Sequence, residues 1–429
     1  MGRPTLQKLL TYVSKVYGIG EKIKRAKDGR KDPDILASTI CSILMLGCLW
    51  RMPSLNVLDQ WVKFGRFKKL FPGVRLPRVD AVRESLSQYD LEPLQAMHDD
   101  TIRKAKRNKV FQQGTMKGRV VVALDGFELF ESKVKECDAC LTRVIDGETH
   151  YYHQGVACMT IGSDPHVILG IDHLHPRDEK DDDEGELTGG KRLIRNLYEQ
   201  HHHFADVIVG DALYANAPFI NDVRAIGMDA IVRVKNKRLN LVKDALGLFQ
   251  KRDSDAQWTH EDPEPKGKQT KRKQKHIHVE AWDEEGFEMG GVPGPVRFLR
   301  FRETITQNMY QGKTVERVET IKEVWVVTTL GKHVPTKDVW EMIHERWDIE
   351  NNGFRELKTK WHIHHCFMHH PRAIEAMVMF IMIAFNLFQL YTFRRVKDFW
   401  NKGMTLSFLI EEFRIDAVRE DVPLYALLE

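Results

Sequence analysis

The sequence has few of the features that mark secreted proteins. It holds six cysteines in 429 residues, and so few, unevenly spaced, do not form a disulfide framework. No apolar run follows the first charges at the N-terminus, so we expect no secretory signal. These features predict a protein of a reducing, intracellular compartment, the cytoplasm.

Long hydrophobic runs are also scarce. The stretch that comes nearest to bilayer length is 373–393, and it carries Glu375, Asn386 and Gln389. A membrane-spanning helix needs about 20 mostly apolar residues, but this stretch has polar groups and no companion segment. We therefore predict a buried core helix and no membrane partner.

Neither sign of charge dominates the chain as a whole, whose net charge is +4. The 42% hydrophobic and 29% charged residues are typical of a globular protein, and 429 residues favour two or three domains. Residues 1–117, however, carry 23 Lys and Arg against 11 Asp and Glu, so 23 − 11 = +12. This local excess predicts a polyanionic partner such as nucleic acid, with a solubilising surface as the alternative.

The composition and the hydrophobic pattern of the chain change along its length. Residues 1–117 are predicted to be helical, and residues 236–322 to be rich in β-structure, with a basic run at 266–275. Between them, short apolar runs predict strands that later alternate with helices. The strands are expected at 120–124, 151–161, 166–174, 205–209 and 230–234, and the helices at 187–203 and 216–226. This order predicts an α/β (α+β) mixed sheet flanked by helices.

Three widely separated carboxylates stand out. Asp125 and Asp211 each follow a predicted strand, and Glu350 lies four residues after Arg346 in a helix-like stretch, where residues four apart share a face. Taken singly, each acid fits a strand end or a helix cap. Together they offer the oxygen ligands that Mg²⁺ prefers, and two such ions can clamp the attacking and leaving oxygens of a phosphodiester.

The segments around these acids resemble the motifs of the DDE transposases of bacterial insertion sequences. The three matching segments, in chain order, are 123–129 (ALDGFEL), 209–216 (VGDALYAN) and 346–358, which begins RWDIE and ends FRELK. The resemblance covers roughly residues 118–395. Three motifs in the right order are far more specific than one.

The resemblance implies a ribonuclease-H-like catalytic domain interrupted by a β-rich insertion. The expected domains are a helical, basic DNA-binding region 1–117, a catalytic domain in two parts, 118–235 and 323–395, the insertion 236–322 and a helical tail 396–429.

It also implies a DNA transposase, which hydrolyses a strand at the transposon end and joins the freed 3′-OH to target DNA. Asp125, Asp211 and Glu350 would hold two Mg²⁺ ions, for which Mn²⁺ can substitute. The expected phosphate-binding residues are Arg346, Lys358, Arg355 and Lys360.

The implied partners are the terminal inverted repeats, target DNA and a second copy of the chain in a homodimer. The implied location is the bacterial cytoplasm, at the nucleoid. Two alternatives stay open: a ribonuclease-H-like nuclease without strand transfer, and a domesticated DNA-binding protein, against which the three intact acids argue.

The third motif departs from the family pattern at two positions. Ile343 replaces a usual Tyr, and Lys358 follows Glu350 by eight residues instead of seven. On a regular helix, eight residues end about 80° away from the starting face. Because Asn351-Asn352-Gly353 are poor helix formers, we hypothesise that they hold a one-residue π-bulge that absorbs the extra residue.

A second cluster has the spacing of a metal site. Cys137 and Cys140 form a C-x2-C pair, and His150 and His153 follow. These four are candidate ligands of a structural zinc, although H-x2-H is tighter than usual, and Cys366 is a further candidate. The alternative is a set of free thiols at a polar helix end.

Overall fold

The computed structural model describes residues 4–176, 182–235, 239–261, 275–311, 314–396 and 403–419, with the backbone alone at 308–311 and 314–316. The chain divides into two compact units. Unit 1 comprises Met1–Gly118, Asp125–His202 and Asp348–Glu429, and unit 2 comprises Arg119–Leu124 and His203–Trp347. The boundaries thus fall beside Asp125 and within the RWDIE motif.

The N-terminal part of unit 1 is helical, as predicted. Its helices are α1 (Leu6–Tyr17), α2 (Ile19–Ile23), α3 (Ala37–Leu49), α4 (Leu55–Lys63), α5 (Val79–Ser87) and α6 (Glu92–Arg107). The side chain of Thr5 caps α1 by accepting the Lys8 N–H at 3.3 Å, and Gly18 ends it with a φ of 67°. A left-handed residue after the last turn is a common helix terminator, and glycine adopts it without steric cost.

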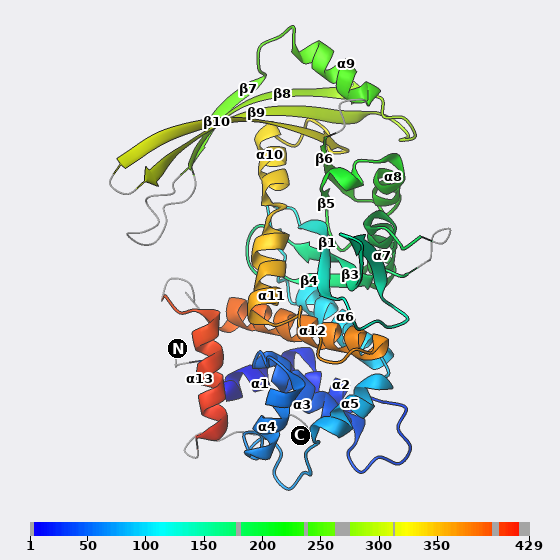
Figure 1. Cartoon of the computed structure of the whole chain (residues 1–429). Coiled ribbons are helices and arrows are strands. Elements are labelled where there is room, and N and C mark those ends of the chain that lie inside the picture. Colours follow the sequence, from blue (N-terminus) through cyan, green and yellow to red (C-terminus); the bar gives the residue numbers. More distant parts are fainter. Residues whose placement is uncertain are drawn as a thin grey trace. The chain divides into compact units, whose positions relative to one another are not determined.

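The long apolar helix α12 (Pro371–Arg395) forms the centre of this unit. It packs against α3, α5 and α6 (Figure 1). By length and composition α12 could cross a membrane, but 94% of its most apolar window is buried inside the protein. It is therefore a core helix, as predicted. The shorter helices α11 (Arg355–Lys360) and α13 (Leu406–Val418) lie before and after it in the chain.

One polar side chain of α12 holds a neighbouring strand. Asn386 is fully buried; it accepts the Ile168 N–H at 2.9 Å and donates to the Ile168 carbonyl at 2.8 Å. His98 of α6 lies 3.2 Å from the same amide nitrogen. A single side chain thus binds both backbone groups of a buried residue, and Nε2 of His98 also lies 3.1 Å from the Ile168 carbonyl.

Unit 1 also contains a small sheet. Its strands are the later part of β1 (Val121–Ser132), β2 (Leu141–Ile145), β3 (Glu148–Thr160) and β4 (Ile168–His173). In this unit β3 pairs with β1, and it is antiparallel to both β2 and β4. Helix α7 (Glu186–His201) packs on β3 and β4.

Unit 2 carries the parallel strands and the insertion. Its elements are β5 (Val207–Gly210), the 3₁₀ helix η1 (Ala212–Tyr214), α8 (Ala217–Ala225), β6 (Asp229–Val234), α9 (Asn240–Phe249), β7 (Ala256–Glu261), β8 (Lys275–Phe287), β9 (Val296–Gln311), β10 (Thr314–Thr328) and α10 (Thr336–Glu345). Its strand order is β1-β5-β6-β10-β9-β8-β7, in which β1–β5 and β5–β6 are parallel and the others antiparallel. The predicted fold class, a ribonuclease-H-like mixed sheet with N-terminal helices, is confirmed.

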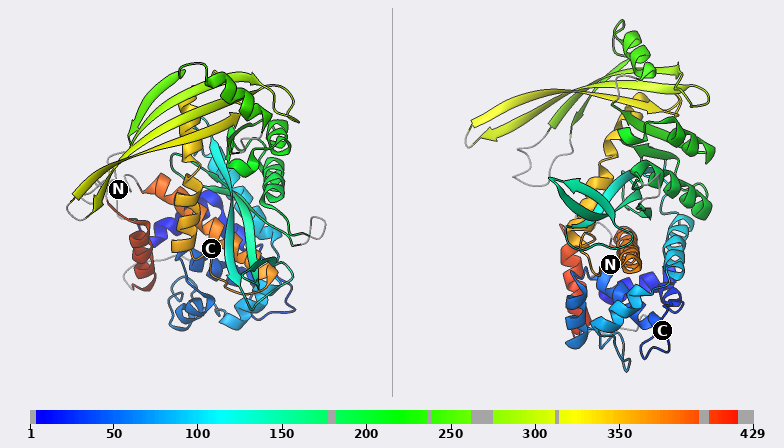
Figure 2. Two further views of the ribbon diagram at one scale, coloured as in Figure 1. Left: turned by 45° about the horizontal axis from the view of Figure 1, so that its top comes forward. Right: turned by 45° about the vertical axis from the view of Figure 1, so that its right-hand side comes forward.

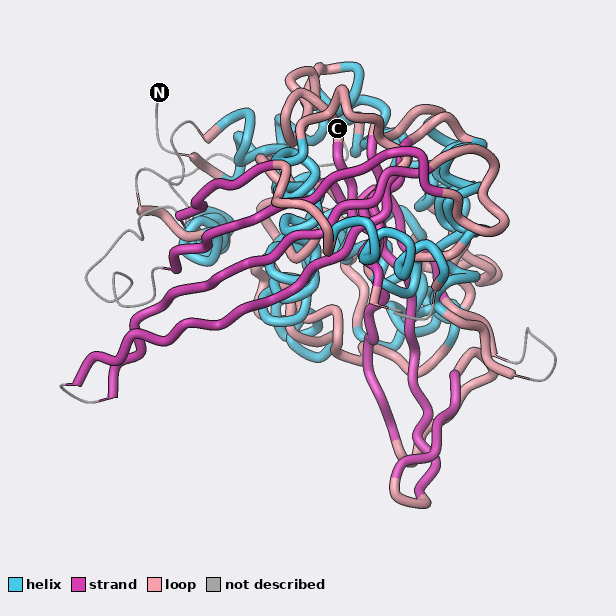
Figure 3. Tube along the Cα trace, turned by 90° about the horizontal axis from the view of Figure 1, so that it is seen from above, coloured by secondary structure: helices cyan, strands magenta, loops and turns pink. Residues whose placement is uncertain are grey.

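The insertion is rich in β-structure, as its sequence suggests, and it also contains α9, which the sequence did not indicate. Its strands form one twisted layer (Figure 2). The β8–β9 pairing starts at Lys275 and Gln307, and β9 and β10 continue beyond it as a two-stranded ribbon (Figure 3). Within the predicted basic run, 266–274 lie outside the described residues.

A buried ion pair joins this layer to α10. Arg297 and Asp283 are 2% and 5% exposed, and the guanidinium donates to the carboxylate. Its remaining donors bind the carbonyls of Gly331 and Val334, both at 2.8 Å. The loop that leads into α10 is therefore held by β8 and β9.

We predict that Asn386→Ala lowers the free energy of unfolding by about 1–3 kcal/mol. The variant leaves the buried Ile168 N–H unsatisfied, whereas the Ile168 carbonyl keeps Nε2 of His98 at 3.1 Å. Chemical denaturation measures the change. The matched control is Asn196→Ala at an exposed position of α7, which is expected to stay within about 0.5 kcal/mol of the wild type. Equal unfolding of both variants would show that the Asn386 hydrogen bonds carry little stability.

Candidate active site

The two aspartates lie at equivalent sequence positions relative to the β1–β5 pairing. In unit 2, β1 and β5 pair in parallel from Val121 with Val207 to Ala123 with Val209. Asp125 and Asp211 each come two residues after the last of these pairs.

The strand that carries Asp125 is longer than the sequence predicted. The prediction placed Asp125 at the exit of strand 120–124, because Asp-Gly is a common turn pair. Instead β1 runs through to Ser132, with Phe127 and Leu129 buried. Asp125 therefore lies within the strand, and the prediction of a strand end is wrong.

The glycine after Asp125 brings a further acid to this strand. The Gly126 N–H donates to Oε1 of Glu186 at 3.1 Å, and a Cβ at Gly126 would lie 2.3 Å from Oε2 of Glu186. A side chain at this position would displace the end of the Glu186 side chain in the first turn of α7. The sequence gave no signal for Glu186, which lies 60 residues from Gly126.

Asp211 caps a helix and keeps further acceptor positions on its carboxylate. Its side chain caps η1 by accepting the Leu213 N–H at 2.8 Å. Behind it, the buried Tyr214 packs on Phe219 with ring centroids 4.8 Å apart. An ionised carboxylate has about four acceptor positions, so one capping bond is compatible with metal binding.

Glu350 lies in a π-helix, η3, that runs from Ile349 to Phe354. The Arg355 N–H donates to the Glu350 carbonyl, five residues back. The hypothesis of a π-bulge at Asn351-Asn352-Gly353 is thus confirmed. Gly353 faces β3 closely, since a Cβ there would lie 2.8 Å from Sδ of Met159.

The π-turn changes which side chains share a face with Glu350. A π-turn holds one residue more than an α-turn, so a residue eight positions away takes the place that the seventh has on a regular helix. Lys358 is that residue, and it is half-buried on α11. Arg355 and Lys360, also on α11, are exposed.

An aromatic contact joins β1 to the π-helix within unit 1. The rings of Phe127 and Phe354 stack with centroids 5.1 Å apart and planes at 28°. Phe127 comes two residues after Asp125, and Phe354 four residues after Glu350. Offset stacking of this kind adds about 0.5–1.5 kcal/mol to the burial of two rings, and it fixes the π-helix on the strand.

The start of the π-helix is held by Asp348 of the RWDIE motif. One carboxylate oxygen accepts from Nε2 of His166 at 2.7 Å and from the Gly162 N–H at 2.9 Å. His166 also lies 3.1 Å from Asp164 through Nδ1. Burial opposes the charge on His166, but the two carboxylates outweigh it and raise its pKa to about 9. A buried cation–carboxylate pair thus anchors the segment that carries Glu350.

A second anchor holds the other end of the same segment. Arg51, which follows α3, donates to Oε1 of Glu356 at 3.1 Å, and Nε1 of Trp361 donates to the same oxygen at 3.1 Å. The guanidinium lies 4.8 Å from the centroid of the Trp361 ring. Burial raises the pKa of Glu356. The sequence could not reveal this pair, whose members are 305 residues apart.

Arg346 belongs to unit 2 and differs from the other candidate phosphate ligands. It is only 8% exposed, and its guanidinium lies 5.0 Å from the ring centroid of Trp347. Trp347 itself is 49% exposed.

The cysteine cluster gathers three of its four predicted members. Cys137, Cys140 and His153 lie together, and His369 joins them in place of His150. His150 instead contacts Glu131 through Nδ1. Burial and the neighbouring His369 lower the pKa of His153 to about 4. Its ring is therefore neutral at physiological pH, as metal binding requires.

We predict that His166→Gln destabilises the fold in a pH-dependent way. The pKa of His166 rises from 6.5 to about 9 on folding, so its stabilisation is complete below pH 6.5 and is lost as the pH rises through about 9. The groups that face it are Asp164, Asp348 and, more weakly, Glu356. The free energy of unfolding of the variant should be lower than that of the wild type by about 3 kcal/mol near pH 6, and this difference should shrink toward pH 9. Unfolding measured across this range checks it, and a deficit independent of pH would contradict it.

Comparison with known proteins adds one match. The family model described as the transposase DDE domain matches residues 146–387, which is 387 − 146 + 1 = 242 of 429 residues. The matched span contains Asp211 and Glu350 and begins after Asp125. No curated protein matches the chain. Because the model covers more than half of the chain, this protein belongs to the transposase DDE-domain family.

Proposed function

We propose that the protein is a DNA transposase of the DDE type, which cuts transposon ends by metal-dependent phosphodiester hydrolysis and joins the 3′-OH to target DNA. The observation that carries the proposal is the π-turn of η3. The π-turn accommodates the extra residue between Glu350 and Lys358. Lys358 therefore lies on the same helix face as Glu350, as the seventh residue of the family motif would on a regular helix. A segment with only a structural role would not need this adjustment.

Asp125, Asp211 and Glu350 are proposed to hold two Mg²⁺ ions, with Mn²⁺ as a substitute. An all-carboxylate donor set suits hard divalent cations and offers nothing to soft ones. When bound, these ions supply an activated water and neutralise charge on the scissile phosphate. The strand, the η1 cap and the π-helix hold the three side chains in place.

The basic residues of the third motif are proposed to bind DNA phosphates. Lys358 has the strongest support, because the π-turn aligns it with Glu350. Arg346, Arg355 and Lys360 have weaker support. Arg346 is nearly buried, and the other two are exposed on α11.

The helical region 1–117 is proposed to contact DNA as well. Phe64 is 76% exposed and lies beside Lys63, whose Nζ is 5.9 Å from its ring centroid. Exposed aromatic groups among lysines can stack on bases while the cations meet phosphates. Lys104 of α6, by contrast, has a structural role, since it donates to the Tyr17 carbonyl at 2.9 Å. We further propose a homodimer on paired transposon ends, acting at the bacterial nucleoid.

We predict that Asp125→Asn lowers Mg²⁺-dependent cleavage of transposon-end DNA by at least about 10²-fold, because the amide removes an anionic metal ligand. Binding of the same DNA should stay within about twofold, since the acid does not bind phosphate. The control is Glu148→Gln, at an exposed glutamate of β3, which should cleave normally. Cleavage by Asp125→Asn at the wild-type rate would remove the assignment.

A second prediction compares two lysines of α11. Lys358→Ala should lower cleavage by about 10-fold or more. Lys360→Ala removes a weaker proposed phosphate contact and should lower cleavage by less than about threefold. The two positions carry the same charge, but they lie about 200° apart around the helix, so only Lys358 shares the face of Glu350. Cleavage rates at saturating DNA separate them, and equal losses would show that general charge near the site is what matters.

A further inference from the structure

We propose that Cys137, Cys140, His153 and His369 bind a structural Zn²⁺ ion. One ligand atom from each residue lies within 4.8 Å of the other three. The cluster uses none of the proposed catalytic acids, so the inference goes beyond the proposed function and stands without it.

The distances between the ligand atoms suit a tetrahedral ion. The two Sγ atoms are 3.5 Å apart, and each lies 3.3 Å from Nε2 of His153. Nε2 of His369 lies 3.8 Å from Sγ of Cys140. With Zn–S bonds of about 2.3 Å and Zn–N bonds of about 2.0–2.1 Å, tetrahedral ligands stand about 3.3–3.8 Å apart. These four of the six separations fall in this interval, and the other two are within 4.8 Å.

The backbone prepares the two thiols for a metal. The Cys140 N–H donates to the Cys137 carbonyl at 2.9 Å, which closes the turn between them. The Cys137 N–H donates to Sγ of Cys140 at 3.3 Å. An amide that points at a sulfur stabilises a thiolate and orients it, as groups around metal ligands commonly do.

The two imidazoles are positioned from separate elements. His153 is on β3. The ring centroid of Phe130, on β1, lies 5.2 Å from that of His153 and 6.2 Å from that of His369. Nδ1 of His369 lies 3.9 Å from Sγ of Cys366. Cys366 therefore contacts the far side of the His369 ring and is not among the four proposed ligands.

The surroundings favour a structural role over a catalytic one. Cys140 and His153 are each only 6% exposed, and four protein ligands leave no open position for a substrate. A disulfide does not explain the pair, since the Sγ atoms are well beyond the bonded distance of about 2.05 Å. Two thiolates and two imidazoles in a tetrahedral set are typical of zinc.

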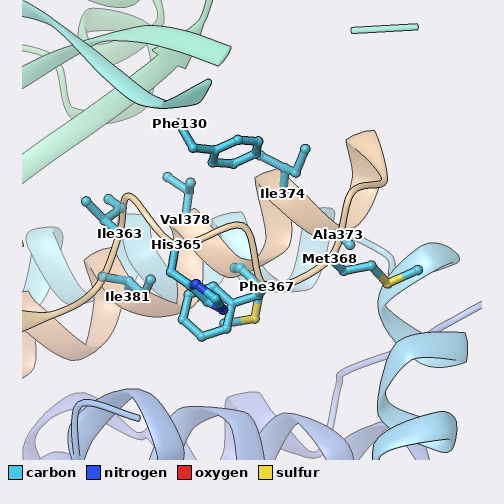
Figure 4. Close-up of a pocket in the computed structure, with 10 residues that line it drawn as sticks. Phe130, Ile363, His365, Phe367, Met368, Ala373, Ile374, Val378 and Ile381 are labelled. Carbon is cyan, nitrogen blue, oxygen red and sulfur yellow. The ribbon is translucent and has the colours of Figure 1, made fainter. Parts of the chain in front are cut away.

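The ion would fasten the segment between α11 and α12 to the sheet of unit 1. In that segment Ile363, Phe367 and Met368 line a small apolar pocket together with Phe130 and side chains of α12 (Figure 4). This contact alone is modest. A zinc bound through His369 would join the same segment to β3 and to the turn at Cys137–Cys140, and so fix the C-terminal end of the helix that carries Lys358.

The first test is the metal content of the full chain, produced without a histidine tag in zinc-supplemented medium and measured by mass spectrometry. We expect about one zinc per chain, a strong loss in Cys137→Ser and in His369→Gln, and no loss in His150→Gln. The last variant is the matched control, because His150 has suitable spacing in sequence but contacts Glu131. Well under one zinc in the wild type, or full zinc in His369→Gln, would overturn the proposal.

The second test does not depend on whether a variant folds. The wild-type chain is stripped with a chelator and titrated with Co²⁺, which gives thiolate-to-metal charge-transfer absorption when two thiolates bind. We expect this absorption at about one equivalent, its displacement by Zn²⁺, and a higher unfolding temperature after Zn²⁺ is restored. No thiolate absorption, or an unfolding temperature that Zn²⁺ leaves unchanged, would also overturn it.

Discussion

The constraint on which the candidate site depends is the hydrogen bond from Arg355 N–H to the Glu350 carbonyl, five residues back. This one π-turn decides which side chains lie on the face of Glu350. Without it, Lys358 would point about 80° away. Single π-turns are rare and occur often at functional sites. Here the turn has a specific consequence, since it brings Lys358 to the helix face of Glu350, which the residue count on a regular helix would not do.

The π-turn is kept in place by contacts on three sides. Asp348 and His166 hold its beginning, Phe127 stacks on Phe354 at its end, and Arg51 with Glu356 secures the helix that follows. Two of these are buried ion pairs, which cost desolvation. In the second pair, the buried Nε of Arg51 has no hydrogen-bond partner among the described residues. The proposed zinc would extend this support beyond α11. Each contact lies within unit 1, which also contains Asp125 and Glu350.

Much of the fold could be predicted from local sequence patterns. Most of the contacts that hold the π-helix in place could not. The Asn-Asn-Gly sequence and the extra residue before Lys358 together pointed to the π-bulge. The length of β1 was missed because Asp125-Gly126 has the composition of a turn, whereas Gly126 continues the strand and donates its N–H to Glu186. Cys366 was chosen as the further candidate ligand, but His369, three residues later, is the one that joins the cluster. Arg51 was missed because no sequence periodicity links it to Glu356, 305 residues away.

The central claim is that this chain joins DNA strands as well as cutting them. The most direct measurement incubates the purified chain and Mg²⁺ with duplexes that carry the inverted repeats flanking its gene, plus a plasmid target. The account predicts covalent products in which the 3′ end of the repeat is joined to the plasmid. Cleaved repeats with no joined product would contradict it and identify a nuclease, and binding without cleavage would identify a DNA-binding protein.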